Sequence, residues 1–185
     1  MRRPGSPRYV MSRFIIRPAT SGDLAPLARV NLNSWRAAYR GLMPAEGMAA
    51  LTLGEFEAVW VENMAAENRR NLVAAVEGEI AGFVSFGPTR NEGADGGVGE
   101  IFGLYLDSAF WNRGIGRALC DEALASMKRD SFREVTLWVL RGNARAIRFY
   151  ELAGFVLEEG ASMSVRRWDV DLPHIRYRRS LTGLS

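Results

Sequence analysis

The sequence predicts an α+β fold, a single domain in which helices flank a mixed β-sheet. Three observations lead to this class. The chain has 185 residues, which suits one domain, and 48% of them are hydrophobic, enough for a substantial core. Segments with the apolar spacing of strands and of helices follow one another along the chain. Several strand-like segments are consecutive, which excludes a sheet built only by alternating strands and helices.

Local signals predict one strand and two helices in the first third of the chain. Residues 14–18 are strand-like and end at a proline. Helix caps precede residues 23–39, whose leucines and valine fall near one helical face. Thr52 and Glu55 have the spacing of a capping box, so a second helix is expected to start there and to run to about residue 68.

Strands dominate the rest of the chain. Two strands are joined by a hairpin at Gly78, and a Gly-rich loop at residues 91–99 precedes a long strand. The predicted order is β-α-α-β-β-β-α-β-α-β-β, with antiparallel and parallel pairs in one sheet. After the first three elements, the segments are strands at 72–77, 80–86 and 100–106, a helix at 114–129, a strand at 134–140, a helix at 144–153, and strands at 155–159 and 177–181.

A glycine-rich turn at residues 111–118 stands between a predicted strand and a predicted helix. Glycines let the backbone turn tightly and leave its N–H groups open, at the positive end of the helix dipole. Such a turn binds a phosphate or pyrophosphate. The alternatives are a plain helix start and two other phosphate loops. A P-loop is excluded because no Gly-Lys pair occurs, and a dinucleotide fingerprint lacks its third glycine, since Leu119 holds that position.

The second half of the chain resembles the GCN5-related N-acetyltransferase (GNAT) family. The family motif has a Gly-x-Gly turn, a helix, a strand and then Asn-x-x-Ala-x-x-x-Tyr-x-x-x-Gly-Phe. One departure is Trp111, which stands where the family has Gln or Arg. The resemblance is strongest over residues 97–160 and weaker over about 13–90. The residues that carry it are Gly114, Ile115, Gly116, Asn143, Ala146, Tyr150, Gly154 and Phe155.

The resemblance implies an acyl-CoA N-acyltransferase fold over residues 13–185, a twisted mixed sheet whose fourth and fifth strands splay apart to admit acetyl-CoA. Main-chain groups of the predicted strand at residues 100–106 would pair with the pantetheine arm, as in β-augmentation. Asn143 would contact the cofactor, or cap the helix that starts there. The implied cofactor-binding residues are Leu104, Tyr105, Leu106, Asn112, Arg113, Gly114, Ile115, Gly116, Arg117, Ala118, Asn143 and Phe149.

Acetyl transfer to an amine makes two chemical demands. The amine must lose a proton, because a lysine-like amine has a pKa of about 10.4. Glu100, at the head of the long strand, is the candidate base, directly or through water; the alternative is a surface glutamate. The leaving thiolate needs a donor, and Tyr150 matches the family's general acid; the alternative is an aromatic that packs with Phe149 and Phe155. A backbone N–H, such as that of Leu106, would hold the oxyanion.

The acceptor is expected to be a primary amine on a small molecule or peptide, attacked directly in a ternary complex. Trp35 and Tyr39 are four residues apart and share a helical face, so they form an acceptor wall or pack in the core. Trp60 is a further candidate, Trp138 is expected in the core and Trp168 at the entrance. A second class of function is a non-catalytic acyl-CoA-binding regulatory module on the same fold.

Composition limits which partners and which cellular location the sequence predicts. A net charge of +3 does not predict binding to nucleic acid. One cysteine, Cys120, and one histidine, His174, predict neither a disulfide framework nor a metal site. No apolar run approaches the ~20 residues that span a membrane. Residues 1–12 are charged, without the apolar core of a signal peptide, and are expected to be a disordered tail. A cytoplasmic protein without membrane contacts is expected, and a homodimer through the last strands is left open.

Overall fold

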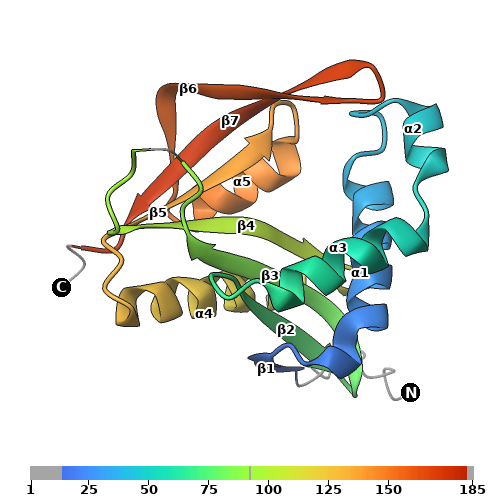
Figure 1. Cartoon of the computed structure of the whole chain (residues 1–185), viewed down its shortest axis with the longest axis horizontal. Helices are drawn as coiled ribbons and strands as arrows, with labels where there is room; N and C mark the ends of the chain where they lie inside the picture. Colours follow the sequence, from blue (N-terminus) through green and yellow to red (C-terminus); the bar gives the residue numbers. More distant parts are fainter. Residues whose placement is uncertain (1–13, 92, 183–185) are drawn as a thin grey trace, which may run out of the picture.

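The computed structural model describes residues 14–91 and 93–182. The predicted tail, residues 1–12, lies outside the described residues. Seven strands form one mixed sheet in the order β1-β2-β3-β4-β5-β7-β6, with helices on both faces (Figure 1). The strands are β1 (Phe14–Pro18), β2 (Arg70–Val76), β3 (Glu79–Pro88), β4 (Val98–Leu106), β5 (Glu134–Leu140), β6 (Val156–Arg167) and β7 (Val170–Ser180). The helices are α1 (Leu24–Ala38), α2 (Ala45–Ala50), α3 (Leu53–Ala65), α4 (Ile115–Arg129) and α5 (Ala144–Leu152).

The predicted fold class, a mixed sheet flanked by helices, is confirmed. Alternating residues of the central strands pack into two separate hydrophobic cores. On β2, Ala74 and Val76 pack with α4, whereas Val73 and Ala75 pack with α1 and α3. Side chains of a strand point alternately to its two faces, so both faces of this part of the sheet are buried. Among the described residues, none of the helices combines the length and the apolar character that crossing a bilayer requires.

The sheet opens between β4 and β5. These strands pair in parallel only from Val98 to Ile101 on β4 and from Glu134 to Leu137 on β5. Beyond these residues β4 stays bonded to β3 through Leu106, and β5 stays bonded to β7. A bulge accompanies the separation, because Ser85 pairs with Gly103 while Phe86 pairs with Ile101, which leaves Phe102 as the extra residue. The two strands therefore diverge, as the resemblance implied.

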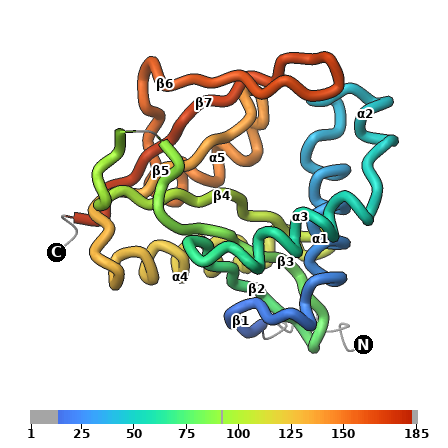
Figure 2. Tube along the Cα trace, viewed as in Figure 1, coloured from blue at the N-terminus to red at the C-terminus, as the bar shows by residue number. Residues whose placement is uncertain are grey.

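The C-terminal hairpin is longer than the predicted strands at 155–159 and 177–181. β6 and β7 span most of residues 156–180, and the turn between them places Trp168 (φ 50°) and Asp169 (φ 57°) in the left-handed region. Many side chains of this hairpin are polar and exposed, so its apolar alternation is weak. The tip reaches α2 (Figure 2), where Gly47 leaves room for the Trp168 ring; a Cβ there would lie 2.3 Å from Trp168 Cδ2.

The first third of the chain contains a helix that the sequence analysis missed. α2 has six residues and follows Pro44, and its Ala and Gly content carries little apolar periodicity. α3 begins at the predicted capping box, where the Glu55 amide donates to Thr52 Oγ1 at 3.4 Å. It ends at Ala65, three residues before the predicted limit.

Candidate active site

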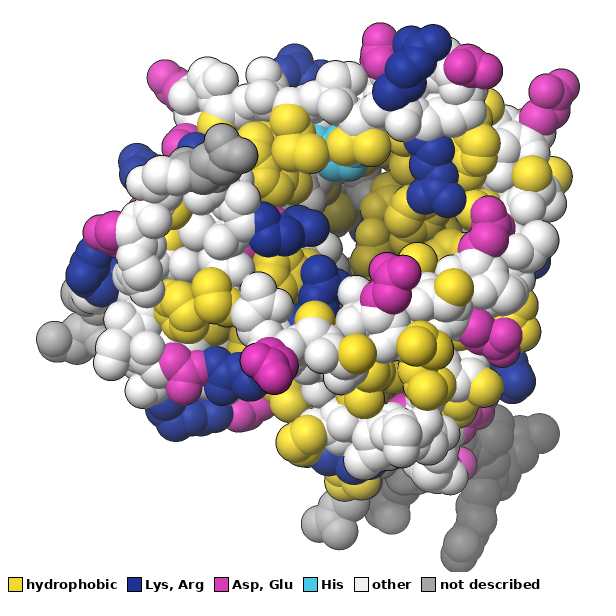
Figure 3. Space-filling view, in the orientation of Figure 1, with side chains coloured by type: hydrophobic (Ala, Val, Ile, Leu, Met, Phe, Trp, Pro, Cys, Tyr) yellow, Lys and Arg dark blue, Asp and Glu magenta, His cyan; other side chains and the backbone are white. Residues whose placement is uncertain are grey.

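A cavity of about 530 Å³ lies where β4 and β5 separate. Its walls come from α1, β4, the turn before α4, β5 and α5, and Figure 3 shows the surface hollowed in this region. The cavity is large enough for a drug-sized ligand. It brings together these residues singled out from the sequence: Tyr39, Leu104, Tyr105, Leu106, Asn112, Gly114, Gly116, Arg117, Asn143, Phe149 and Tyr150.

Five predicted residues do not belong to this lining. Ile115 is 1% exposed and packs in the core, so only its backbone faces the turn. Arg113 is exposed and stacks on Phe110, with 5.3 Å from its Cζ to the ring centroid. Ala118, Trp35 and Glu100 are likewise absent from the lining.

The turn before α4 has the backbone conformation that is typical of an anion-binding nest. Asn112 (φ 61°) and Gly114 (φ 79°) adopt the left-handed conformation, and Gly114 is the N-cap of the 15-residue helix α4. Left-handed residues next to a helix start point successive amides to one side, which forms a nest for anions. Gly116 keeps the nest open toward the cavity. A Cβ there would lie 3.4–3.8 Å from the side chains of Leu106, Phe149 and Leu104.

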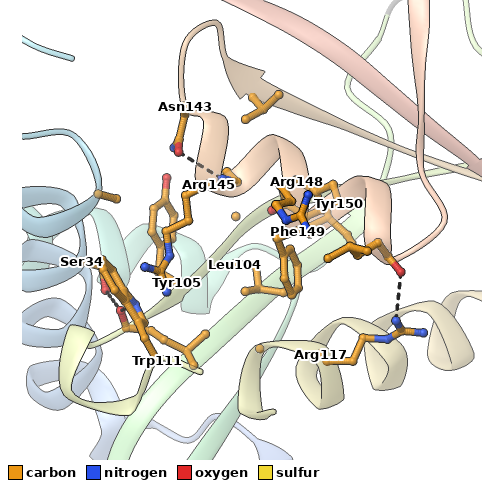
Figure 4. A pocket seen from close by; sticks show the side chains of 18 of the residues that line it. Ser34, Leu104, Tyr105, Trp111, Arg117, Asn143, Arg145, Arg148, Phe149 and Tyr150 are labelled. Atoms are coloured by element: carbon orange, nitrogen blue, oxygen red, sulfur yellow. Dashed lines mark hydrogen bonds between the residues drawn. The ribbon is translucent and has the colours of Figure 1, made fainter. Parts of the chain in front are cut away.

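Arginines surround the same end of the cavity (Figure 4). Arg117, Arg145 and Arg148 line it. Arg117 is anchored by Asp121, with Nε 2.8 Å from Oδ2, and by the carbonyl of Leu152 at 3.1 Å from its Nη1. The guanidinium of Arg145 stacks on Trp111, 3.6 Å from the ring centroid. The nest therefore lies in a positively charged environment, which favours a phosphorylated ligand.

Trp111 ties the turn to β4. Its Nε1 donates to the carbonyl of Leu106 at 3.1 Å, and Ser34 Oγ donates to the same oxygen at 2.7 Å. Figure 4 shows Ser34 and Trp111 side by side below Tyr105. The residue that departs from the family motif thus holds the turn against the end of the diverging strand.

Tyr150 lies on α5 and points into the cavity region beside Phe149 (Figure 4). It is 8% exposed and packs edge-on against Phe149 and Phe155, with centroids 5.2 and 5.7 Å away. None of the side-chain hydrogen bonds of the described residues uses its hydroxyl. Burial raises the pKa of Tyr150, and the nearby Cys120 and Tyr105 add to the effect. The phenol is therefore protonated at neutral pH and can donate a hydrogen bond.

Asn143 caps α5. Its Oδ1 accepts a hydrogen bond from the Ala146 amide at 3.2 Å, and the residue is 7% exposed. The side chain also lines the cavity, so the capping role and a ligand contact are compatible.

Glu100 is held apart from Tyr150. It is 1% exposed, and Arg90 binds both carboxylate oxygens: Nη2 lies 2.5 Å from Oε1 and the backbone N 2.9 Å from Oε2. Thr89 Oγ1 is 3.4 Å from Oε2. The carboxylate therefore anchors the turn that follows β3.

The opposite end of the cavity is aromatic. The hydroxyl groups of Tyr39 and Tyr105 form a hydrogen bond, with their oxygens 3.0 Å apart. Burial raises the pKa of both phenols, which stay neutral. Trp35 packs edge-on behind Tyr39, with centroids 5.1 Å apart. Trp60, a further candidate in the sequence, is fully buried in the core.

Several lining residues were not identified from the sequence. Trp138 was expected in the core, yet it is half-buried and lines the cavity because β5 has left β4 at that level. Arg145 and Arg148 are three residues apart on a short amphipathic helix, a spacing that could have indicated a shared face. The other missed residues include Ser34, Ala38 and Phe102, which no local pattern distinguishes.

Comparison with known proteins agrees with this geometry. The model of the acetyltransferase (GNAT) family matches residues 33–155. The chain belongs to the GNAT acetyltransferase family. An uncharacterized N-acetyltransferase, YuaI of Bacillus subtilis, is 30% identical to this GNAT protein. The match covers 74% of this chain and 76% of the YuaI chain.

Two further matches come from Thermoplasma acidophilum, one in sequence and one in structure. Its spermidine N(1)-acetyltransferase is 26% identical over 78% of this chain and 89% of its own. The crystal structure of its PaiA N-acetyltransferase in complex with coenzyme A superposes with a TM-score of 0.70 and 22% identity, covering 91% of this chain and 99% of that chain. That likeness confirms the fold predicted for this acetyltransferase.

Proposed function

We propose that the protein transfers the acetyl group of acetyl-CoA to a primary amine of a small molecule or peptide, by direct attack in a ternary complex. The observation that carries this proposal is the amide nest before α4, which opens onto a cavity with Tyr150 in its wall. PaiA, which has the same fold, was crystallised with coenzyme A, and the two relatives described above are named as N-acetyltransferases.

The cavity fits the two ends of acetyl-CoA. Amides of the turn at residues 112–118 and the guanidinium groups of Arg117, Arg145 and Arg148 suit its phosphates. The pantetheine arm carries amides, and the edge of β4 at Leu104–Leu106 is not paired with β5. Gly116 adds support, because a larger side chain there would fill the space between the turn and β4.

In the reaction, acetyl-CoA supplies the activated acetyl group. Tyr150 is proposed to donate a hydrogen bond to the sulfur as the thiolate leaves. Its raised pKa disfavours full proton transfer, so stabilisation of developing charge is the larger effect. The attacking amine must lose a proton. We propose that this proton leaves through water to the solvent and not directly to Glu100, because Arg90 occupies that carboxylate and Glu100 does not line the cavity.

Ligand-dependent thermal unfolding and a thiol-release assay test the proposal. Acetyl-CoA at 100 times its dissociation constant should stabilise the protein by about 2.7 kcal/mol, whereas NAD should have no effect. Thiol release should then depend on an added primary amine. Absence of stabilisation by acetyl-CoA at millimolar concentration would exclude the proposal. Stabilisation without amine-dependent thiol release, over a broad amine panel, would favour the non-catalytic acyl-CoA-binding module.

A further inference from the structure

On the face of the sheet that α1 and α3 cover, two arginines lie next to the cavity without being part of its lining. The bulge at Phe102 places this aromatic ring in the cavity lining. Two guanidinium groups lie against the ring: Cζ of Arg69 is 4.4 Å and Cζ of Arg90 4.7 Å from its centroid. Stacking holds a guanidinium in position and leaves its in-plane N–H groups to form hydrogen bonds. Arg90 gives such bonds to Glu100, and Arg69 gives one to Asn63.

Of the two positive charges on Arg69 and Arg90, only one is compensated by a carboxylate. Glu100 is occupied by Arg90, with bonds to both of its oxygens. Arg69 donates to the neutral amide oxygen of Asn63 at 2.7 Å, and within residues 14–91 and 93–182 no carboxylate lies at ion-pair distance from it. Burial, and then the adjacent Arg90, lowers the pKa of Arg69, as expected for a cation without its own counter-ion. An arginine nevertheless stays protonated, so one positive charge is left over.

Further cations border the hollow. Figure 3 shows Lys and Arg side chains around it. Arg167 lies against the rings of both Trp35 and Trp168, with its Cζ 4.9 and 4.5 Å from their centroids, and it forms no ion pair among the described residues. Arg176 stacks on Trp138, a lining residue, and is neutralised by Glu158. Of these two arginines, only Arg167 therefore adds a positive charge without an ion-pair partner among the described residues.

We propose that the acceptor amine carries a carboxylate, which Arg69 binds at the Phe102 ring while the amine points toward Tyr150. Tyr39, Tyr105 and Trp138, which also line the cavity, suit an apolar body in the acceptor. The inference rests on the proposed acetyl transfer and specifies its substrate class. A polyamine is disfavoured, because its second ammonium group would face Arg69 and Arg90 without a free carboxylate.

Matched pairs of amines test this inference. Each pair has the same amine and differs only in its far end: 4-(aminomethyl)benzoate against 4-(aminomethyl)benzamide, and 6-aminohexanoate against 6-aminohexanamide. Spermidine serves as the polycation. For the better carboxylate, kcat/KM should exceed that of its amide about 10-fold, as expected for a charge-assisted hydrogen bond, and the ratio should fall as salt is raised.

Adjacent arginines provide a matched control. In Arg69→Met, the kcat/KM of each carboxylate should be close to that of its amide. Arg69→Lys should keep a smaller preference for the carboxylate than the wild-type protein has. Arg70→Met removes the same charge from the other face of the sheet, where Arg70 pairs with Asp130 and bonds Ser126 Oγ at 3.0 Å. It should leave the ratio unchanged. Acetyl-CoA binding, measured by calorimetry on every variant, reports whether the fold and the cofactor site are intact.

The possible outcomes separate the two proposals. Failure of the wild-type protein to bind acetyl-CoA would exclude the proposed function itself. If acetyl-CoA binds, equal rates within each pair, faster reaction of the amides or of spermidine, or no acetylation of either carboxylate would overturn the inference alone. An unchanged ratio in Arg69→Met would overturn it as well.

Discussion

At the scale of single residues, burial decides what each polar group in the cavity can do. Tyr150 is enclosed by aromatic rings, and burial keeps its phenol neutral. Glu100 is buried more deeply, yet its carboxylate is compensated by Arg90. One group is thus a free donor in the cavity and the other an occupied acceptor outside it.

Replacing Tyr150 by Phe removes only the hydroxyl. We expect kcat to fall about 10- to 1000-fold, because the leaving sulfur loses its donor, while the affinity for acetyl-CoA changes little. Steady-state kinetics and calorimetry measure the two quantities. Tyr177→Phe is the control. It removes a hydroxyl that donates to Glu151 at 3.2 Å, and Tyr177 is not part of the cavity lining. An unchanged kcat in Tyr150→Phe would reject the proposed role.

A second single-residue prediction concerns acid stability. Asp23 binds Arg17 through two hydrogen bonds of 2.7 and 2.8 Å, and this partner holds the pKa of Asp23 well below its usual range. A lowered pKa in the folded state stabilises the protein above the unfolded-state value of about 3.9, and this contribution is lost as the pH falls through the lowered pKa.

Asp23→Asn should therefore cost about 2 kcal/mol of unfolding free energy at pH 7. The difference from wild type should shrink as the pH falls below about 4. Urea unfolding at several pH values measures it. A cost that is constant down to strongly acidic pH would show that the ion pair is not its source.

At the scale of elements, the start of α4 combines a backbone requirement with a steric one. Gly114 needs its left-handed conformation to cap the helix. Gly116 has no left-handed φ, and a Cβ there would contact the side chains of Leu106, Phe149 and Leu104, which line the cavity. The two glycines therefore serve different purposes, one for folding and one for access.

Substitution of Gly116 by Val should fill the space between the turn and β4. We expect the dissociation constant for acetyl-CoA to rise about 10- to 100-fold, the range that overpacking by 1–3 kcal/mol produces. Gly54→Val is the matched control, because Gly54 is also the second residue of a helix and nothing lies within 4 Å of its Cβ position. Equal affinities of the two variants would contradict the proposed cradle.

At the scale of the whole molecule, the C-terminal hairpin reaches the helices at the N-terminal end of the chain. It leaves the far edge of the sheet and reaches α2, so residues separated by more than a hundred positions meet at Gly47 and Trp168 (Figure 1). The Arg167 side chain then lies between Trp168 and Trp35. The hairpin thereby links the C-terminal strands to α1 and α2, near the residues proposed to contact the acceptor.

Trp168→Ala should loosen this link. We expect KM for the amine to rise several-fold and the unfolding free energy to fall by about 2 kcal/mol, because the half-buried indole is lost, while acetyl-CoA affinity stays unchanged. Val170→Ala changes an exposed hairpin side chain and is the control. A rise in KM that is equal in both variants would indicate a general effect of the hairpin rather than the contact with α2.

The sequence alone determined the features that depend on neighbouring residues. The capping box at Thr52, the hairpin at Gly78 and the glycine turn before α4 arise from interactions over a few positions, so local patterns sufficed to place them. The family resemblance added the opening between the fourth and fifth strands of a mixed sheet, which the structure confirms.

Only the tertiary structure decided how distant segments share one cavity. Trp138 and Phe102 line the cavity because two strands diverge there. Glu100 lies where β4 and β5 are still paired and bonds Arg90, and Trp168 meets Gly47 across the molecule. These contacts depend on strand pairing and register between segments far apart in sequence. Periodicity reports which face of an element is apolar, but not which partner covers that face, so the two arginines at the Phe102 ring became visible only in three dimensions.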